Sequence, residues 1–503
     1  MPQILTLGTS DDVAVALQAV PAGQFLPSLR ITTLSGIPAG HKLATRAIRA
    51  GEPIRKFNQI IGFATRTICP GEHVHTHNLV TGDFARDYSV SSEAQPTALL
   101  NPSDVATFLG IVRPDGRVAT RNYVGILTTV NCSGSVARRI AAHFTSEILS
   151  EYPNVDGVVA ITHGTGCGMA EHGEPADLLR RVFAGYATHV NFGAVLLLGL
   201  GCETNQIGHL TSLTGPSSTL RSATIQEEGG TTASVKKGIA TIYELLAQAN
   251  EVHRIPVPVS NLFVGLQCGG SDAYSGISAN PALGAAVDLL VRNGGTAILS
   301  ETPEIYGAEH LLTRRSKNPD VAHRLIERIR WWEEYTARHK GSIDNNPQPG
   351  NKTGGLTTIL EKSLGAISKG GTTNLNEVYL YAQPVRDQGL VFMDSPGFDP
   401  VSATGQVAGG SNLICFTTGR GSVYGCKPTP SIKIASNTAL FHRMSDDMDI
   451  NCGTIIDGKE TVEEAGARIF AEMLSVASGT PTRSEIHGFG EEEFQPWLQS
   501  ATL

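Results

Sequence analysis

The sequence predicts an α/β protein, in which a small, mostly β N-terminal domain is followed by two α/β domains with largely parallel sheets. From Val105 onward, short apolar runs alternate with glycine-rich or polar turns and with amphipathic segments, a pattern typical of parallel α/β folds. Before residue 85 the apolar runs are shorter and are broken by glycine and proline, which indicates strands and tight turns. The length of 503 residues allows two to four domains.

We expect the region boundaries to follow breaks in the apolar pattern. Residues 81–104 are small and polar without periodicity, and Pro256 and Pro258 interrupt the chain between two α/β patterns. A strongly amphipathic helix is predicted over residues 326–339. The expected regions are a β domain at 1–85, a linker at 86–104, an α/β domain at 105–255 and a second α/β domain at 256–503.

Composition excludes several classes of protein. The net charge is −8 and no long basic run occurs, so a nucleic-acid partner is not expected. The apolar runs are too short to span a membrane. The N-terminus has no pattern of a secretion signal, and none of the eight cysteines lies in a CxxC pair. We therefore expect a cytoplasmic protein with reduced thiols and no simple zinc ribbon.

Five apolar strands end in side chains that bind metals or transfer protons. Since the carboxyl ends of parallel strands form the ligand-binding edge of a sheet, these residues predict a functional site. A lone buried cysteine is more often a core residue, and we expect Cys69, Cys415, Cys426 and Cys452 to be of that kind. The strand-end residues are Asn131, Cys132, His163, Cys167, Cys202, Glu203, Cys268, Ser271, Asp272 and Glu301.

The stretch "GEHVHTHNL" places His73, His75 and His77 at alternating positions. On a strand these three imidazoles would share one face and would suit a divalent transition metal. The alternative is an exposed edge strand with incidental histidines. Arg420, between two glycines, and Lys352, in a glycine-rich loop, are candidates for binding a carboxylate, and a surface turn is the alternative for each.

Several motifs in one order resemble the altronate/galactarate dehydratase family. They are "HGTGCG", "GLGCE", "QCGGSDAYSGISANPALG", "SETPEIYGAEHLL", "NPQPGNKTGGLTTILEKSLG" and "TTGRGSVYG". The N-terminal region resembles the SAF (β-clip) domain of such enzymes. The resemblance implies dehydration of a sugar acid to a 2-keto-3-deoxy acid with a divalent metal, usually iron(II), rather than an iron–sulfur cluster. "HVHTHN" resembles the altronate type, whereas "QCGGSDAYSG" and "HGTGCG" are closer to the galactarate type, so the substrate stays open.

Dehydration of a 2,3-dihydroxy acid needs a base for the carbon-2 proton, an acid for the 3-hydroxyl and a stabilised intermediate. The cofactor expected is Fe(II), with Mn(II) as the alternative, and the partners expected are a small sugar acid and a second copy of the chain in a dimer. The alternatives are a lyase acting on another 2,3-functionalised hydroxy acid, a cysteine-dependent hydrolase and a binding module without chemistry.

The candidate residues are His163, Asp272 and Glu301 for catalysis, Lys352, Arg420, Ser271 and Asn131 for the substrate, and His75, His77, Cys202, Glu203 and Cys268 for the metal, with Cys132, Cys167 and His73 as further possibilities.

Overall fold

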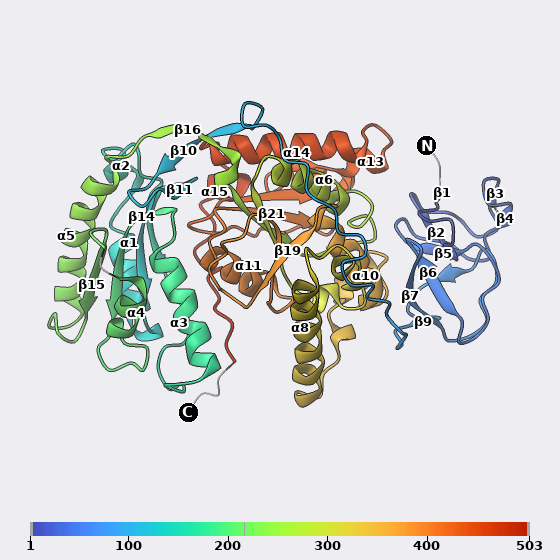
Figure 1. Ribbon diagram of the computed structural model, residues 1–503, viewed down its shortest axis with the longest axis horizontal. Coiled ribbons are helices and arrows are strands. Elements are labelled where there is room, and N and C mark those ends of the chain that lie inside the picture. The colour runs from blue at the N-terminus through green and yellow to red at the C-terminus, as the bar shows by residue number, and fades with distance from the viewer. Residues whose placement is uncertain (1–3, 216, 500–503) are drawn as a thin grey trace.

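The computed structural model describes residues 4–215 and 217–499 and confirms the α/β prediction. A small β domain and a four-stranded α/β domain lie on opposite sides of a larger C-terminal α/β domain (Figure 1). No helix within the described residues is both long and apolar enough to cross a membrane. This side-by-side order decides which strand ends can share a site.

The N-terminal domain consists of short antiparallel strands joined by tight turns. One sheet has the order β1-β2-β5-β8 and another the order β6-β7-β9, with β3 and β4 as a separate hairpin. The strands are β1 (Ile4–Leu5), β2 (Val13–Ala16), β3 (Phe25–Leu26), β4 (Ile31–Thr32), β5 (Lys42–Ala44), β6 (Pro53–Lys56), β7 (Gln59–Ala64), β8 (His73–Val74) and β9 (Leu79–Val80). Cys69, expected in a core, is exposed.

The segment between the first two domains contains no helix or strand from residue 83 to 106. It is nevertheless fixed to the C-terminal domain by backbone hydrogen bonds. The amide of Ser91 donates to the carbonyl of Thr313 at 2.9 Å, and the amide of Leu100 donates to that of Arg292 at 2.9 Å. The linker therefore runs along the C-terminal domain as a strap.

The second domain has a four-stranded sheet of order β13-β12-β14-β15, in which every pair is parallel. Its strands and helices are β12 (Tyr123–Thr128), α1 (Gly134–Ala141), α2 (Ser146–Leu149), β13 (Gly157–Ile161), α3 (Glu174–Ala187), β14 (Phe192–Gly199), α4 (Ile207–Thr214), β15 (Leu220–Thr224) and α5 (Thr231–Ala249). The next strand along the chain, β13, pairs with one side of β12, and the following strand, β14, pairs with its other side. The crevice between β12 and β14 is thus the switch point at which such sheets bind ligands.

A small antiparallel sheet lies between the second and third domains. Its order is β11-β10-β16, with β10 (Thr107–Val112), β11 (Val118–Ala119) and β16 (Arg254–Pro258). β16 crosses residue 255, where a boundary was expected, and holds both prolines that suggested one. Proline is compatible with β16 because this is an edge strand, where one row of amides needs no partner.

The C-terminal domain is built on a seven-stranded parallel sheet of order β19-β20-β18-β17-β21-β22-β23. Its strands are β17 (Phe263–Cys268), β18 (Thr296–Leu299), β19 (Leu375–Tyr379), β20 (Gly389–Met393), β21 (Leu413–Thr418), β22 (Ser431–Ala435) and β23 (Ile450–Asn451). Its helices are α6 (Ala279–Arg292), α7 (His310–Thr313), α8 (Pro319–Arg338), α9 (Pro349–Thr353), α10 (Ile359–Ile367), α11 (Asp399–Ala408), α12 (Thr438–Arg443), α13 (Gly453–Ile456), α14 (Val462–Ala477) and α15 (Arg483–Ile486). The amphipathic helix predicted over 326–339 is confirmed within α8.

Two apolar contacts join the domains. The N-terminal domain shares one buried cluster with the C-terminal domain, which includes Ile54, Ile61 and Leu364. After α15 the chain turns back, and Phe494 packs on Tyr186 of the second domain with ring centroids 4.5 Å apart. The end of the described chain passes between these two domains in Figure 1. The three domains are thus held by packed side chains as well as by the strap.

Candidate active site and metal centre

Three imidazoles meet where the N-terminal domain contacts the C-terminal domain. His41 precedes β5 and His73 begins the neighbouring strand β8, so His41 Nδ1 lies 3.0 Å from His73 Nε2. The ring centroid of His75 lies 4.8 Å from that of His41. One nitrogen from each of the three rings lies within 4.8 Å of the others. His41 Nε2 is 3.3 Å from the carbonyl oxygen of Thr353 in α9, so this histidine cluster borders the C-terminal domain.

The histidines converge by a turn rather than by strand alternation. β8 ends at Val74, and the expected strand through residue 77 does not form. Asn78 stabilises the turn, since its side chain accepts from the amide of His75 and donates to the carbonyl of His73, both at 2.9 Å. His77 lies beside His73, with ring centroids 5.4 Å apart, but is exposed.

The electrostatics of the histidine cluster suit a divalent ion. Burial lowers the pKa of His73 to about 3 and that of His75 to about 4, and neighbouring positive groups act in the same direction. Burial also lowers the pKa of His41. All three rings are therefore neutral at pH 7, the state that offers a lone pair to a metal. His75 Nδ1 is buried without a hydrogen-bond partner among the described residues, as expected of an atom reserved for a ligand.

A buried ion triad fixes the histidine cluster against the C-terminal domain. Lys42 of β5 and Lys56 of β6 each place Nζ 2.9 Å from a carboxylate oxygen of Glu361 in α10. Thr357 donates to the same carboxylate from its amide at 3.0 Å and from its hydroxyl at 2.6 Å. Burial acts to raise the pKa of Glu361, but the two ammonium groups outweigh it and hold that pKa well below its usual range.

The next residue of α10 leads to a second buried cluster at the carboxyl edge of the large sheet. Lys362 Nζ donates to Glu304 Oε1 at 2.7 Å, and the thiol of Cys268, at the end of β17, lies 3.5 Å from Glu304 Oε2. Lys369 Nζ lies 3.7 Å from Glu301 Oε2. Neither oxygen of Glu301 has a hydrogen-bond partner among the described residues, and its backbone has a left-handed φ of 71°. We call these five residues the acid–lysine cluster.

The carboxyl groups near the acid–lysine cluster differ in protonation. Burial and the charge of Glu304 raise the pKa of Glu301 well above its usual value, whereas Lys362 and Lys369 outweigh burial and lower that of Glu304. Asp399 begins α11, and burial and Glu304 raise its pKa to about 7. A Cβ atom on Gly269 would lie 2.4 Å from Asp399 Oδ2, so glycine lets this carboxylate approach the loop after β17. Groups with separated pKa values are the usual arrangement for acid and base roles.

The acid–lysine cluster fits a divalent ion less well than the histidines do. Cys268, Glu301 and Glu304 offer three ligand atoms within 4.8 Å of one another. Lys362 already neutralises the Glu304 carboxylate, burial raises the pKa of the Glu301 carboxyl well above its usual value, and burial raises the pKa of the Cys268 thiol to about 12. A metal would therefore have to displace both a proton and a lysine contact.

Asp272 lies at this edge but is saturated with donors. Its carboxylate accepts from the amide and hydroxyl of Ser275 at 2.8 and 2.9 Å, from Ser436 at 2.8 Å and from Asn437 at 3.1 Å. This arrangement ties two loops together, and burial raises the pKa of Asp272 although these donors act to lower it. The other candidates lie nearby: Ser271 is buried with an unpartnered hydroxyl, Lys352 is half-buried in α9, and Arg420 is exposed after β21.

The other candidates lie at the carboxyl edge of the parallel sheet of the second domain. They are Asn131, Cys132, His163, Cys167, Cys202 and Glu203. This domain and the N-terminal domain flank opposite sides of the C-terminal domain (Figure 1). No hydrogen bond or ion pair within the described residues joins these candidates to the histidine cluster or to Cys268. The expected metal set of His75, His77, Cys202, Glu203 and Cys268 is therefore not brought together.

Two polar residues at the second edge have structural partners. His163 Nε2 donates to the carbonyl of Thr128 at 3.0 Å, and its Nδ1 accepts from the amide of Thr165 at 3.2 Å, so both ring nitrogens are occupied. The carboxylate of Glu203 accepts from the Thr129 hydroxyl at 2.5 Å and from the amide of Gly201 at 2.6 Å. Both side chains brace the loops that carry Cys132, Cys167 and Cys202.

Sequence reasoning missed His41, Glu304, Lys362, Lys369 and Asp399 as site residues. Glu304 follows a recognised strand end, and Lys362 lies in a motif that carries the family resemblance, so these two had a signal. His41, Lys369 and Asp399 come from a turn, a helix end and a helix start without any local pattern.

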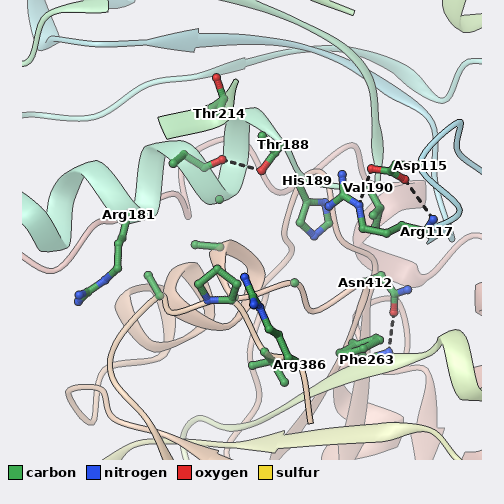
Figure 2. A pocket seen from close by; sticks show the side chains of 18 of the residues that line it. Asp115, Arg117, Arg181, Thr188, His189, Val190, Thr214, Phe263, Arg386 and Asn412 are labelled. Carbon is green, nitrogen blue, oxygen red and sulfur yellow. Dashed lines mark hydrogen bonds and ion pairs between the residues drawn. The ribbon is translucent and has the colours of Figure 1, made fainter. Parts of the chain in front are cut away.

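A cavity of about 820 Å³ lies elsewhere, between the second and third domains. Its walls include residues that precede β14, β17, β20 and β21, so it opens at the amino edges of the strands. Figure 2 shows Arg386 projecting toward the gap and Arg117 paired with Asp115. Since ligands of parallel α/β sheets bind at the carboxyl edges, the edge that carries the acid–lysine cluster is a better candidate for chemistry than this cavity.

Comparison with protein families matches the three domains in order. The SAF domain of altronate/galactarate dehydratases matches residues 2–82. The second domain of D-galactarate dehydratase/altronate hydrolase matches residues 110–250, and the C-terminal domain of D-galactarate/altronate dehydratase matches residues 259–502. These matches define the class as a three-domain dehydratase.

Individual relatives agree over most of the chain. An altronate dehydratase of Bacillus subtilis (strain 168) is 32% identical over 494 residues, 98% of each chain. A galactarate dehydratase (L-threo-forming) of Escherichia coli (strain K12) is 38% identical over 93% of this chain and 92% of its own. The beta subunit of a (2R)-sulfolactate sulfo-lyase of Chromohalobacter salexigens is 32% identical over 76% of this chain and 96% of its own. The chain therefore belongs to the altronate/galactarate dehydratase family and is an enzyme of the hydro-lyase type.

Proposed function

We propose that the chain dehydrates an aldonate or aldarate of the altronate or galactarate type to its 2-keto-3-deoxy acid, with a divalent ion held by His41, His73 and His75. The observation that carries this proposal is the meeting of three neutral imidazoles at the border with the C-terminal domain. The ion proposed is iron(II), with manganese(II) as the alternative. Once bound, such an ion would polarise the carboxylate and 2-hydroxyl of the acid and so acidify the carbon-2 proton.

The chain's own residues supply the proton transfers. Asp399, with a pKa of about 7, is the proposed base for the carbon-2 proton, because a base works best with a pKa near the operating pH. Glu301 is the proposed acid, because burial keeps its carboxyl protonated and able to donate to the departing 3-hydroxyl. Lys362 and Lys369 bring positive charge to the same edge, which favours a carboxylate substrate.

The test combines a metal assay with a substrate screen. Purified chain is stripped with a strong chelator and supplied with iron(II) or manganese(II) under reducing conditions. Aldonic and aldaric acids are then screened for 2-keto acid formation. We expect no turnover in stripped protein and restored turnover with the ion, whereas full turnover without metal would refute the metal-dependent mechanism.

A double variant locates the ion. His73→Ala/His75→Ala should abolish iron(II) binding and turnover while leaving the melting temperature close to the parent value, since both rings are half-exposed. His253→Ala, an exposed histidine outside the N-terminal domain, is the control and should bind metal normally. Normal iron binding in the double variant would move the metal away from the histidine cluster.

A second candidate function is elimination from another hydroxy acid substituted at carbon 3. The observation that favours it is the likeness to the sulfo-lyase beta subunit. Loss of a sulfonate group at carbon 3 also begins with removal of the carbon-2 proton, so the same acid and base would serve. Adding sulfolactate to the screen and measuring sulfite release separates the two candidates.

A further inference from the structure

The cavity between the second and third domains has walls from both of them (Figure 2). Its volume of about 820 Å³ lies in the range of sites that hold small organic molecules, which is roughly 300–1,000 Å³. Arg181 and Ala184 of α3 form one wall, and Ala408 at the end of α11 belongs to another. The cavity opens at the amino edges of the strands, away from the acid–lysine cluster, so the proposed chemistry does not use it.

Glycines set the boundary between α3 and α11. A Cβ atom on Gly185 of α3 would lie 2.3 Å from the carbonyl oxygen of Ala408, so glycine lets the two helices touch at this point. Gly410 follows α11, and a Cβ atom there would meet no atom within 4 Å, because Gly410 borders open space. The two helices therefore touch at Gly185, and the cavity begins beside that contact.

The walls of the cavity are mainly apolar. Such walls favour an apolar ligand, because binding removes the apolar surfaces of both from water. They disfavour the polyhydroxylated acids of the proposed reaction, because each buried hydroxyl group would need a hydrogen-bond partner. The apolar side chains include Val118, Val190, Leu213, Phe263, Pro384 and Val385.

Three arginines and one carboxylate are found among the described residues that line the same space. Arg117 pairs with that carboxylate, Asp115, at 2.8 Å. Arg181 reaches the C-terminal domain, where its Nε donates to the carbonyl of Tyr381 at 3.1 Å. Arg386 projects toward the gap in Figure 2, and its guanidinium has no hydrogen bond or ion pair within the described part of the chain. Two guanidinium groups thus border the cavity without a carboxylate at ion-pair distance.

The surroundings of Arg181 indicate that an anion would be favourable beside it. Burial lowers the pKa of Arg181, although Asp177 and Glu174 act to raise it. A half-buried guanidinium without a paired carboxylate loses part of its hydration, and an anion that accepts its hydrogen bonds offsets that loss.

From the apolar walls and the two unpaired arginines, we infer that this cavity binds a small organic anion with an apolar body. The apolar body would fill the space between the walls, and the anionic group would accept hydrogen bonds from the arginines. Because the walls come from two domains, such a ligand would also hold the second domain against the third.

The experiment titrates the full-length chain with anilinonaphthalene sulfonate, an aromatic anion whose fluorescence rises in apolar surroundings. We expect saturable binding of about one molecule per chain. Decanoate should displace this probe. Decanol lacks the charge and sulfate lacks the apolar body, so each should compete at least about tenfold less well than decanoate.

Three variants test the charge and the space. Arg386→Gln should weaken probe binding about tenfold at an unchanged melting temperature, because the exposed guanidinium has no partner to lose among the described residues. Arg330→Gln, which changes an exposed arginine of α8 outside the cavity, is the matched control and should bind the probe normally. Ala184→Phe fills the space from α3 and should abolish binding.

Hydrogen exchange locates the ligand, since decanoate should slow the exchange of amides in α3 and at the end of α11. His73→Ala/His75→Ala should bind the probe as the parent chain does, so this inference and the proposed function can fail separately. The inference is overturned by the absence of saturable binding, by parent-like affinity in Arg386→Gln or Ala184→Phe, or by decanol that competes as well as decanoate. Protection confined to another part of the chain would overturn it as well.

Discussion

Removal of the Glu361 carboxylate should undock the N-terminal domain. Glu361 accepts from Lys42 and Lys56, both at 2.9 Å, and all three side chains are fully or almost fully buried. Glu361→Gln leaves two ammonium groups at an interface without their counter-ion. Removing one partner of a buried ion pair typically costs about 3–5 kcal/mol. Because both lysines belong to one domain and Glu361 to the other, we expect this loss at the interface rather than across the whole chain.

Hydrogen exchange and denaturant unfolding measure the effect. Amides of the N-terminal domain and of the strap should exchange faster in Glu361→Gln, while those of the large sheet stay protected. Glu492→Gln is the control, since Glu492 forms an exposed pair with Arg138 at 3.2 Å that should be worth less than about 1 kcal/mol.

An apolar triple variant tests the physical reason. Lys42→Met/Lys56→Met/Glu361→Leu removes all three charges and keeps similar volume, and buried pairs replaced in this way often lose little stability or gain some. We expect the triple variant to regain most of the stability lost in Glu361→Gln. The reasoning fails if Glu361→Gln is as stable as the parent chain, or if the triple variant is no better than the single one.

Three further predictions concern other parts of the chain. Burial lowers the pKa of His189 to about 4, so the unfolded chain binds more protons than the folded chain between pH 6.5 and 4. The free energy of unfolding should therefore decrease by up to about 3 kcal/mol as the pH falls through that window. In His189→Gln, the decrease measured between pH 7 and 4.5 should be smaller. Glu301→Gln should lower kcat by about 10²–10⁴-fold without changing the melting temperature, and near-normal turnover would exclude it as the acid. Trp497→Ala removes a ring stacked 5.3 Å from Trp332 and should cost about 3–5 kcal/mol in a denaturant titration, whereas Leu498→Ala, an exposed control, should cost little.

The sheets could be predicted because their residues repeat a local pattern. The apolar runs before Cys132, Cys167, Cys202 and Cys268 are β12, β13, β14 and β17, and every one ends where polar residues begin. The same pattern carries no information on which sheet a strand joins. Four strand ends with similar chemistry were therefore expected in one site, and the fold divides them between two.

The residues that complete the site depend on contacts between distant segments. His41 meets His73 because β5 and β8 pair, although 32 residues separate the two histidines. Lys42 meets Glu361 across 319 residues because one domain docks on another. A lysine in a short strand is ordinarily exposed, and only docking makes this one a buried partner. Such residues have no local pattern, so periodicity and motif spacing cannot find them.

The separation of the two edges changes how a metal analysis must be interpreted. The histidine cluster and the three exposed cysteines of the second domain lie in domains on opposite sides of the C-terminal domain (Figure 1). Iron bound by exposed thiols would add to the iron held by the imidazoles, so total iron alone does not locate the ion. Alkylation of the exposed thiols before the metal is added blocks that contribution and leaves the imidazoles available. Turnover restored by iron(II) in the alkylated chain would implicate the histidine cluster, whereas loss of turnover on alkylation would require the second domain as well.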